Sequence, residues 1–265
     1  MSDKYGKVIP TGKLLDGERR SILFDATKCI GCRQCVHACK DWNEHARTSV
    51  FEISPTNWIT IEPPVLDALS PTWARNSCMH CDFPMCAAVC PVEAITKYDE
   101  GPVVINHDVC IGCEYCVHAC PWGVISQNSV TKKAEKCTMC SDRIAENKQP
   151  FCVQACPAEA LDFGLEAGMK KKSRDRAKEI NGFVYGEAEA GGTQLLYVLA
   201  GNKSDYAVRN VGRERYPRHK IPLKLMIKDL FTFRCHPRGK LRALYLAIIH
   251  PHRLVYRYWP WRRSE

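Results

Sequence analysis

Sixteen of the seventeen cysteines fall into four runs of four, and this spacing constrains the fold more than any other feature of the sequence. The runs are Cys29, Cys32, Cys35 and Cys39; Cys78, Cys81, Cys86 and Cys90; Cys110, Cys113, Cys116 and Cys120; and Cys137, Cys140, Cys152 and Cys156. Each run ends with two cysteines that are separated by three residues. Regular groups of thiols in a chain of this length predict metal binding rather than ordinary packing.

The runs repeat one another. CIGCRQCVHAC in run one and CIGCEYCVHAC in run three agree at nine of eleven positions. Proline follows the last cysteine of runs two, three and four, whereas Lys40 takes that place in run one. Self-similarity of this kind indicates one structural unit that is used several times.

The C-x2-C-x2-C-x3-C spacing predicts cubane iron–sulfur clusters. Three closely spaced thiolates can wrap one face of a cubane, and Gly31 and Gly112 ease the tight turn that this requires. The fourth cysteine then serves the other cluster of a pair, so that four runs hold four [4Fe–4S] clusters. Structural zinc sites use two separated pairs of ligands, and disulfide frameworks belong to small secreted domains, so both alternatives fit less well.

Short apolar segments before two of the runs predict strands, at Ser21–Phe24 and Pro102–Ile105. We expect short helices after each C-x3-C step and a strand at Leu195–Leu199 after the GGT turn. The fold class is therefore α+β, with two ferredoxin-like bis-[4Fe–4S] units and an extended basic C-terminal arm. The clusters are expected to replace much of a conventional core, so that their loss would unfold the chain.

Charge separates the arm from the body. Residues 213–265 contain 14 Lys and Arg against 3 Asp and Glu, although the net charge of the whole chain is only +9. The sequence contains no run of 18 or more apolar residues, so no membrane-spanning helix is predicted. The first residues do not resemble a signal peptide. Location stays open between the cytoplasm and a periplasm reached by export together with a partner.

The four runs in this order resemble the four-cluster subunit that serves molybdenum and tungsten oxidoreductases, over roughly residues 20–165. CMHCDFPMCAAVCP (78–91) and KCTMCSDRIAENKQPFCVQACPAEAL (136–161) carry this resemblance. CKDWNE after run one and GGTQLLYVL (191–199) favour the formate dehydrogenase branch. The subunits of dimethyl sulfoxide, polysulfide and thiosulfate reductases, and of nickel–iron hydrogenases, remain alternatives.

The resemblance implies how the runs pair, which spacing alone leaves open. Runs one and four would form one unit, in residues 20–77 with 131–165, and runs two and three the other, in residues 78–130. The implied ligand sets are Cys29, Cys32, Cys35 and Cys156; Cys39, Cys137, Cys140 and Cys152; Cys78, Cys81, Cys86 and Cys120; and Cys90, Cys110, Cys113 and Cys116. Residues 166–212 would form a post-cluster segment, and residues 213–265 the basic arm.

Several other residues have ordinary interpretations. Cys235 is expected to be a spare thiol, and Met79 and His80 to be loop residues. Lys40, Lys132, Lys133 and Lys136 either offset the negative charge of clusters or lie on a solvated surface. Trp42 and Trp122 either shield clusters from water or belong to the core.

No flavin, pterin or nucleophile signature is present, so the chain is expected to transfer electrons without a catalytic site of its own. The expected partner is a molybdenum- or tungsten-pterin catalytic subunit. A quinone-reactive or cytochrome membrane subunit, or another electron carrier, would complete the path. The arm is expected to wrap a partner or to lie on a membrane surface. A zinc-dependent module that uses the arm to bind nucleic acid is the distant alternative.

Overall fold

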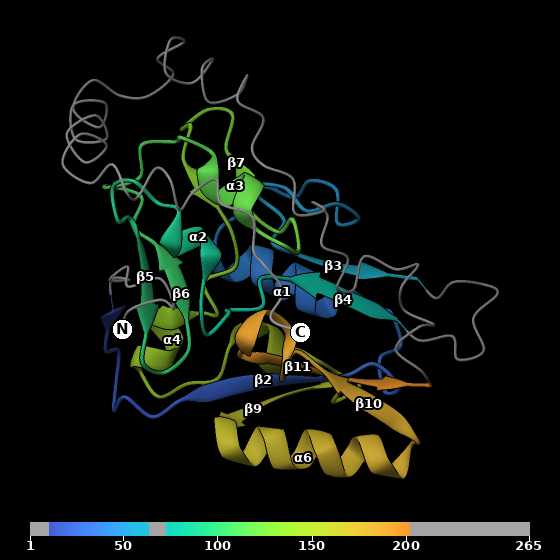
Figure 1. Ribbon diagram of the computed structural model, residues 1–265. Helices are drawn as coiled ribbons and strands as arrows, with labels where there is room; N and C mark the ends of the chain where they lie inside the picture. Colours follow the sequence, from blue (N-terminus) through green and yellow to red (C-terminus); the bar gives the residue numbers. More distant parts are fainter. Residues whose placement is uncertain (1–10, 64–72, 202–265) are drawn as a thin grey trace.

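The computed structural model describes residues 11–63 and 73–201, which form many short elements (Figure 1). The strands are β1 (Thr11–Gly12), β2 (Arg20–Asp25), β3 (Ile59–Glu62), β4 (Ala74–Ser77), β5 (Ile95–Tyr98), β6 (Val103–Ile105), β7 (Ser126–Gln127), β8 (Ala134–Glu135), β9 (Leu161–Leu165), β10 (Gly182–Tyr185) and β11 (Leu195–Ala200). The helices are α1 (Gln34–Trp42), α2 (Met85–Ala88), α3 (Tyr115–Ala119), α4 (Ser141–Ala145), α5 (Phe151–Gln154) and α6 (Glu166–Glu179), with a 3-10 turn at Glu189–Gly191. The expected mixture of helices and strands is confirmed.

The largest sheet has the strand order β10-β11-β2-β9. β2 and β11 are parallel, whereas β9 and β10 run antiparallel to their neighbours. Ile22 is paired with Leu195 on one side and Phe163 on the other. Every residue of β2 is buried, as expected for a central strand that is covered on both faces. The predicted strands at Ser21–Phe24 and Leu195–Leu199 are therefore confirmed.

Helix α6 covers the outer face of this sheet (Figure 1). Leu23, Leu196 and Val198 from the sheet pack with Ala177 of the helix in a small apolar cluster. The exposed side of α6 is charged and carries ion pairs such as Lys171–Asp175. The sheet therefore faces α6 on one side and the cysteine-containing body on the other.

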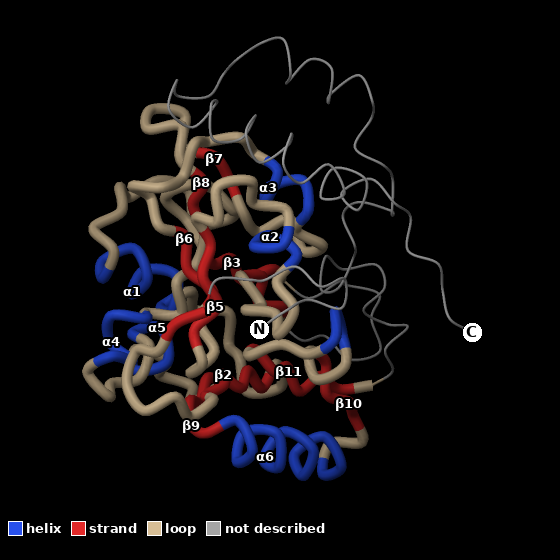
Figure 2. The backbone as a smooth tube through the Cα atoms, turned by 60° about the vertical axis from the view of Figure 1, so that its left-hand side comes forward, coloured by secondary structure: helices blue, strands red, loops and turns tan. Residues whose placement is uncertain are grey.

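Three smaller sheets complete the fold: β1-β5-β6, the β3–β4 hairpin and the β7–β8 hairpin. The predicted strand at Pro102–Ile105 corresponds to β6 and is confirmed. Glu100 anchors the N-terminal segment, because its carboxylate accepts hydrogen bonds from the backbone of Leu14, Leu15 and Gly17. β7, β8 and α3 lie at the end of the molecule opposite α6 (Figure 2).

The prediction of helices after each C-x3-C step is wrong for three of the four runs. Helices α2, α3 and α5 contain the third cysteine of their runs and end by the fourth. Pro91, Pro121 and Pro157 follow that fourth cysteine, and a proline disfavours helical backbone in the residue before it. Only run one, with Lys40 in place of proline, continues its helix to Trp42.

The two predicted glycine turns are confirmed. Gly31 and Gly112 both have φ of 70°, in the left-handed region that favours glycine. A Cβ at Gly112 would lie 2.0 Å from the backbone oxygen of Lys132, and a Cβ at Gly31 would overlap the Trp73 ring. Any side chain at either position would therefore displace the cysteine loop.

A continuous apolar core surrounds the cysteines, and it is larger than the sequence led us to expect. It includes Phe24, Val36, Ile59 and Ile95 together with most of the buried cysteines. The basic arm and Cys235 lie outside the described residues. No helix in residues 11–63 or 73–201 is long and apolar enough to span a bilayer.

We predict that Leu196→Ala lowers the free energy of unfolding by about 2–5 kcal/mol, because it removes a fully buried side chain beneath α6. Anaerobic denaturant titration of the intact protein measures this change. Leu165→Ala is the matched control, since its side chain is 50% exposed and its loss should change stability by less than about 0.5 kcal/mol. Equal effects of the two substitutions would contradict the described packing of α6.

Candidate metal centres

The sixteen cysteines of the four runs all lie in the described part of the chain, and each has a free thiol. Cys32 is exposed, and Cys29, Cys81, Cys86, Cys90, Cys113 and Cys156 are half-buried, while the others are buried. Burial of so many free thiols in one core is unusual, and their mutual positions show how the structure groups them.

The first group combines thiols from runs one and four. Burial raises the pKa of the Cys29 thiol, and the nearby thiols of Cys156 and Cys32 shift it in the same direction. Burial also raises the pKa of Cys35 to about 12, with Cys29 and Cys156 again among the neighbours that contribute. Cys29, Cys32, Cys35 and Cys156 therefore lie together, although the last comes from the far end of the cysteine-rich region.

The second group also combines runs one and four. The Cys39 thiol is deeply buried, which raises its pKa, and Cys137, Cys152 and Cys140 are the neighbouring thiols that raise it further. Burial raises the pKa of Cys137 to about 11, with a contribution from Cys152. Helix α4 lies in the long gap between Cys140 and Cys152. After this insertion the chain comes back to the second group at Cys152.

The third group lines a cavity. Cys78, Cys81, Cys86 and Cys120 line one cavity together with apolar side chains, among them Trp122. Burial raises the pKa of Cys86 to about 12 and that of Cys120 to about 11, and Cys78 adds to both shifts. Four thiols from runs two and three thus face one apolar cavity.

The fourth group takes one thiol from run two and three from run three, whereas the third group takes three from run two and one from run three. Burial raises the pKa of Cys116, and Cys113, Cys90 and Cys110 are among the thiols that add to this shift. Cys110 belongs to the loop on which the β7–β8 hairpin packs, because Lys133 donates a hydrogen bond to its backbone oxygen. The division of these thiols into the four ligand sets that the resemblance implies stays a prediction.

Thiols of different groups also act on one another. Cys152 raises the pKa of Cys35, Cys78 raises that of Cys137, and Cys86 raises that of Cys116. In each case this thiol has a larger effect than the other thiols that act on the same cysteine. The groups therefore adjoin one another within the core.

The donor chemistry fits iron–sulfur clusters. Thiolates bind iron, and a metal deprotonates the thiols that coordinate it, whereas burial here opposes ionisation of the free thiols. Within residues 11–63 and 73–201, no three His, Cys, Asp or Glu side chains converge closely enough to hold a single metal ion. Four thiols instead line the cavity of the third group, which is the number that one cubane cluster requires.

Buried cations lie beside the thiols. Arg75 is 1% exposed, and Lys40 and Lys136 are each 2% exposed, so a solvated surface does not explain these two lysines. Lys40 donates hydrogen bonds to the backbone oxygen of Ala46 and to the Thr48 hydroxyl. The sequence allowed Lys40 and Lys136 a role in offsetting the negative charge of clusters. Arg75 was missed because no motif marks it.

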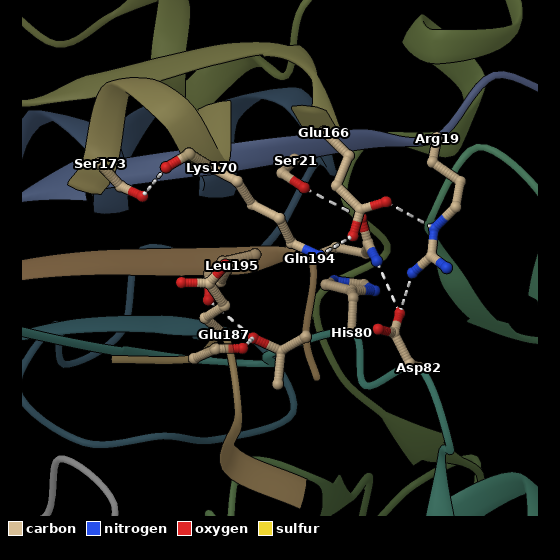
Figure 3. Close-up of polar contacts among 12 residues, drawn as sticks. Arg19, Ser21, His80, Asp82, Glu166, Lys170, Ser173, Glu187, Gln194 and Leu195 are labelled. Atoms are coloured by element: carbon tan, nitrogen blue, oxygen red, sulfur yellow. Dashed lines mark hydrogen bonds and ion pairs between the residues drawn. The ribbon is translucent and has the colours of Figure 1, made fainter. Parts of the chain in front are cut away.

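The GGTQ segment supports the first loop of run two (Figure 3). The side chain of Gln194 donates to the Asp82 carboxylate at 2.7 Å and accepts from the Ser21 hydroxyl at 3.0 Å. The backbone of Thr193 forms a bridge with Cys81. Arg19 joins the same network by pairing with Asp82 and with Glu166. The segment thus ties β2, α6 and the cysteine loop together.

His80 is part of this support and not a simple loop residue. It is fully buried, and its Nδ1 accepts a hydrogen bond from the backbone N–H of Val103 at 2.9 Å. Burial, with the nearby cations Lys136, Lys97 and Arg75, lowers the pKa of His80. A neutral ring is what an acceptor Nδ1 requires. The sequence of run two marks only its cysteines as functional, whereas the contact of His80 with Val103 depends on the folded structure.

The two tryptophans differ in their surroundings. Trp122 lines the cavity of the third group, and its Nε1 donates to the Tyr185 hydroxyl at 3.0 Å. Trp42 is 38% exposed and packs on Phe151 of α5, with ring centroids 5.4 Å apart. Trp122 is therefore in place to exclude water from thiols, whereas Trp42 links two helices.

The cysteine-rich region matches known families of iron–sulfur proteins. Two family models, each described as a 4Fe-4S dicluster domain, match residues 71–166 and 28–94. These matches confirm the expected ferredoxin-like character of the fold and the expected 4Fe–4S clusters.

Named relatives are subunits of oxidoreductases. The formate dehydrogenase-O iron-sulfur subunit of Escherichia coli is 35% identical over 67% of this chain and 65% of its own length. The B subunit of the anaerobic dimethyl sulfoxide reductase of the same organism is 39% identical over 58% of this chain and 78% of its own length. The formate dehydrogenase iron-sulfur subunit of Haemophilus influenzae is 32% identical over 67% of this chain and 63% of its own length. The protein thus spans less than two thirds of the formate dehydrogenase subunits.

We predict that Gln194→Ala lowers the free energy of unfolding by about 1–3 kcal/mol, because it leaves buried polar atoms of Ser21 and Asp82 without this partner. Denaturant titration under anaerobic conditions measures the change. Gln154→Ala is the control, since Gln154 is exposed, although its amide accepts a hydrogen bond from the buried Arg143, and its loss should have a smaller effect. Comparable losses in the two variants would rule out the supporting role of Gln194.

Proposed function

The chain belongs to the family of iron–sulfur electron-transfer subunits of molybdopterin oxidoreductases, and from that premise we propose that it relays electrons through four [4Fe–4S] clusters. The proposed path joins a molybdenum- or tungsten-pterin catalytic subunit to a second redox partner. One observation carries this proposal: thiols from runs that lie far apart in the sequence, such as Cys29 and Cys156 or Cys39 and Cys137, are neighbours in the core.

The proposed ligands are the members of these groups. They are Cys29, Cys32, Cys35 and Cys156; Cys39, Cys137, Cys140 and Cys152; Cys78, Cys81, Cys86 and Cys120; and Cys90, Cys110, Cys113 and Cys116. When bound, each cluster supplies a centre that accepts and releases one electron. The protein supplies the fixed spacing, the exclusion of water and the charges around each centre.

Exposure differs between the thiol groups. All four thiols of the second group are buried, whereas the first group contains the exposed Cys32 and the half-buried Cys29 and Cys156. The third and fourth groups each contain two half-buried thiols, Cys81 with Cys86 and Cys90 with Cys113. We propose that the first and fourth groups are the ends of the relay, where electrons enter and leave, because electron transfer needs close approach only there.

The crossing of the runs supports a division into two units. The first comprises residues 20–77 with 131–165, and the pairing of β2 with β9 joins its two parts. The second comprises residues 78–130. In the post-cluster segment, residues 166–212, α6, β10 and β11 extend the sheet of the first unit. Residues 213–265 form the basic arm, for which we propose contact with a partner subunit or with a membrane surface without crossing it.

Formate dehydrogenase is the catalytic partner that we propose first, because relatives with that name align over 67% of this chain. A reductase of the dimethyl sulfoxide type is the second candidate, since the B subunit of such an enzyme has the higher identity of 39%. Anaerobic purification of the native complex followed by mass spectrometry distinguishes the two. Recovery of a hydrogenase large subunit instead would contradict both.

We predict about sixteen irons and a similar amount of acid-labile sulfide per chain in protein purified without oxygen. Elemental analysis and a sulfide assay measure both. Such protein should be brown and should bleach on exposure to air. A colourless protein that contains zinc and no iron would support the zinc-module alternative and exclude the relay.

Serine substitutions test how the runs pair. We predict that Cys32→Ser and Cys156→Ser, in runs one and four, disturb the same paramagnetic signal of the reduced protein. Cys39→Ser should disturb a second signal, the one that Cys140→Ser also affects. Electron paramagnetic resonance with iron quantification makes the comparison. If Cys32→Ser and Cys39→Ser instead changed one common signal, each run would hold its own cluster and the proposed crossing would be wrong.

A further inference from the structure

Arg75 occupies an unusual position between the first two thiol groups. It lies on β4, opposite Ile61 of β3, and its side chain is almost completely buried. One terminal nitrogen of its guanidinium donates to the Cys152 sulfur at 3.8 Å. The other terminal nitrogen and Nε have no hydrogen-bond partner among the described residues. The cation is thus directed at a sulfur and is otherwise unsatisfied.

No carboxylate balances this charge within residues 11–63 and 73–201, where Arg75 takes part in none of the ion pairs. The groups that act on it most strongly through their charge are Cys152, Tyr197, Cys35 and Cys137. Cys35 belongs to the first thiol group, and Cys137 and Cys152 to the second. A buried cation without a counter-charge is strongly destabilising. The negative charge that balances it must therefore come from the thiolates and from what they hold.

Lys40 and Lys136 are also buried without a carboxylate partner, but their ammonium groups donate hydrogen bonds to oxygen atoms of Thr48 and Cys137. Three further buried cations have other partners. Arg20, on β2, is 8% exposed and pairs with Asp16. Lys97 has Asp82 as its partner at 3.9 Å. Arg143 stacks on the Trp42 ring and donates to Gln154. Arg75 alone among these six has sulfur ligands as its principal partners.

We propose that Arg75 is a tuning residue that raises the reduction potential of the clusters in the first two sites, and most of all the one held by Cys152. This inference rests on the proposed function. A reduced cluster carries one more negative charge than an oxidised cluster, so a fixed positive charge nearby stabilises the reduced state more. A hydrogen bond to a ligand sulfur acts in the same direction.

The test is a set of variants with the potentials read by redox titration under electron paramagnetic resonance, a readout that does not depend on the partner. Arg75→Met and Arg75→Gln remove the charge, whereas Arg75→Lys retains it. We expect the two neutral variants to lower one or two of the four potentials and to leave the others unchanged. Arg75→Lys should restore most of the shift.

Arg20→Met is the matched control, because it also removes a buried arginine from a strand but has Asp16, Glu18 and Glu100 as charged neighbours instead of thiols. Its four potentials should equal those of the native protein. Native potentials in fully loaded Arg75→Met or Arg75→Gln, or an equal shift in Arg75→Lys, would overturn the tuning role.

Cluster assembly is measured on the same samples. Loss of iron from both neutral variants, with native iron in Arg75→Lys, supports the inference, since charge is the property that separates them. Loss of iron from all three variants overturns it and assigns Arg75 to packing. Absence of iron from the native protein would instead refute the proposed function itself, so that the two failures are distinguishable.

Discussion

The fold depends on thiols from distant runs meeting in one core. Cys156 joins Cys29, and Cys39 joins Cys137, although long stretches of sequence lie between these partners. Such contacts close very long loops, which is entropically costly until the contacts themselves stabilise the fold. A cluster with four strong bonds can offset that cost at a single point. Metal binding and folding are therefore expected to be coupled in this chain.

Charge balance is the second consequence of grouping thiolates inside a protein. Burial raises the pKa of the free thiols, so that they become anionic only with a cation at hand. Iron supplies most of that positive charge, and the protein adds Arg75, Lys40 and Lys136 from within its core. The buried cations are distributed unequally among the thiol groups. Centres with the same four ligands are thereby given different electrostatic surroundings, which is how a protein separates their potentials.

The cysteine pattern predicted much of the site, because ligand spacing is a local property of the sequence. The strands at β2, β6 and β11 followed from apolar segments, and the turns at Gly31 and Gly112 from the need for tight loops. What the sequence did not reveal depends on contacts between distant segments. Gln194 reaches Asp82, and Arg75 reaches Cys152, only after the protein has folded. The helices of runs two, three and four were predicted after the fourth cysteine, but they end before it. The proline that follows this cysteine disfavours helical backbone in the residue before it.

The one departure from that repeat explains how the ends of the cysteine-rich region are joined. With Lys40 in place of proline, α1 continues to Trp42. The extra turn brings the indole onto Phe151 of α5, and its Nε1 donates to Asp142 of α4 at 2.8 Å. The guanidinium of Arg143 lies over the same ring, 4.5 Å from its centroid. A proline at position 40 would end α1 one turn earlier and separate run one from run four. The lysine therefore allows α1 to reach the helices of run four, whereas the helices that hold the third cysteine of runs two, three and four end before a proline.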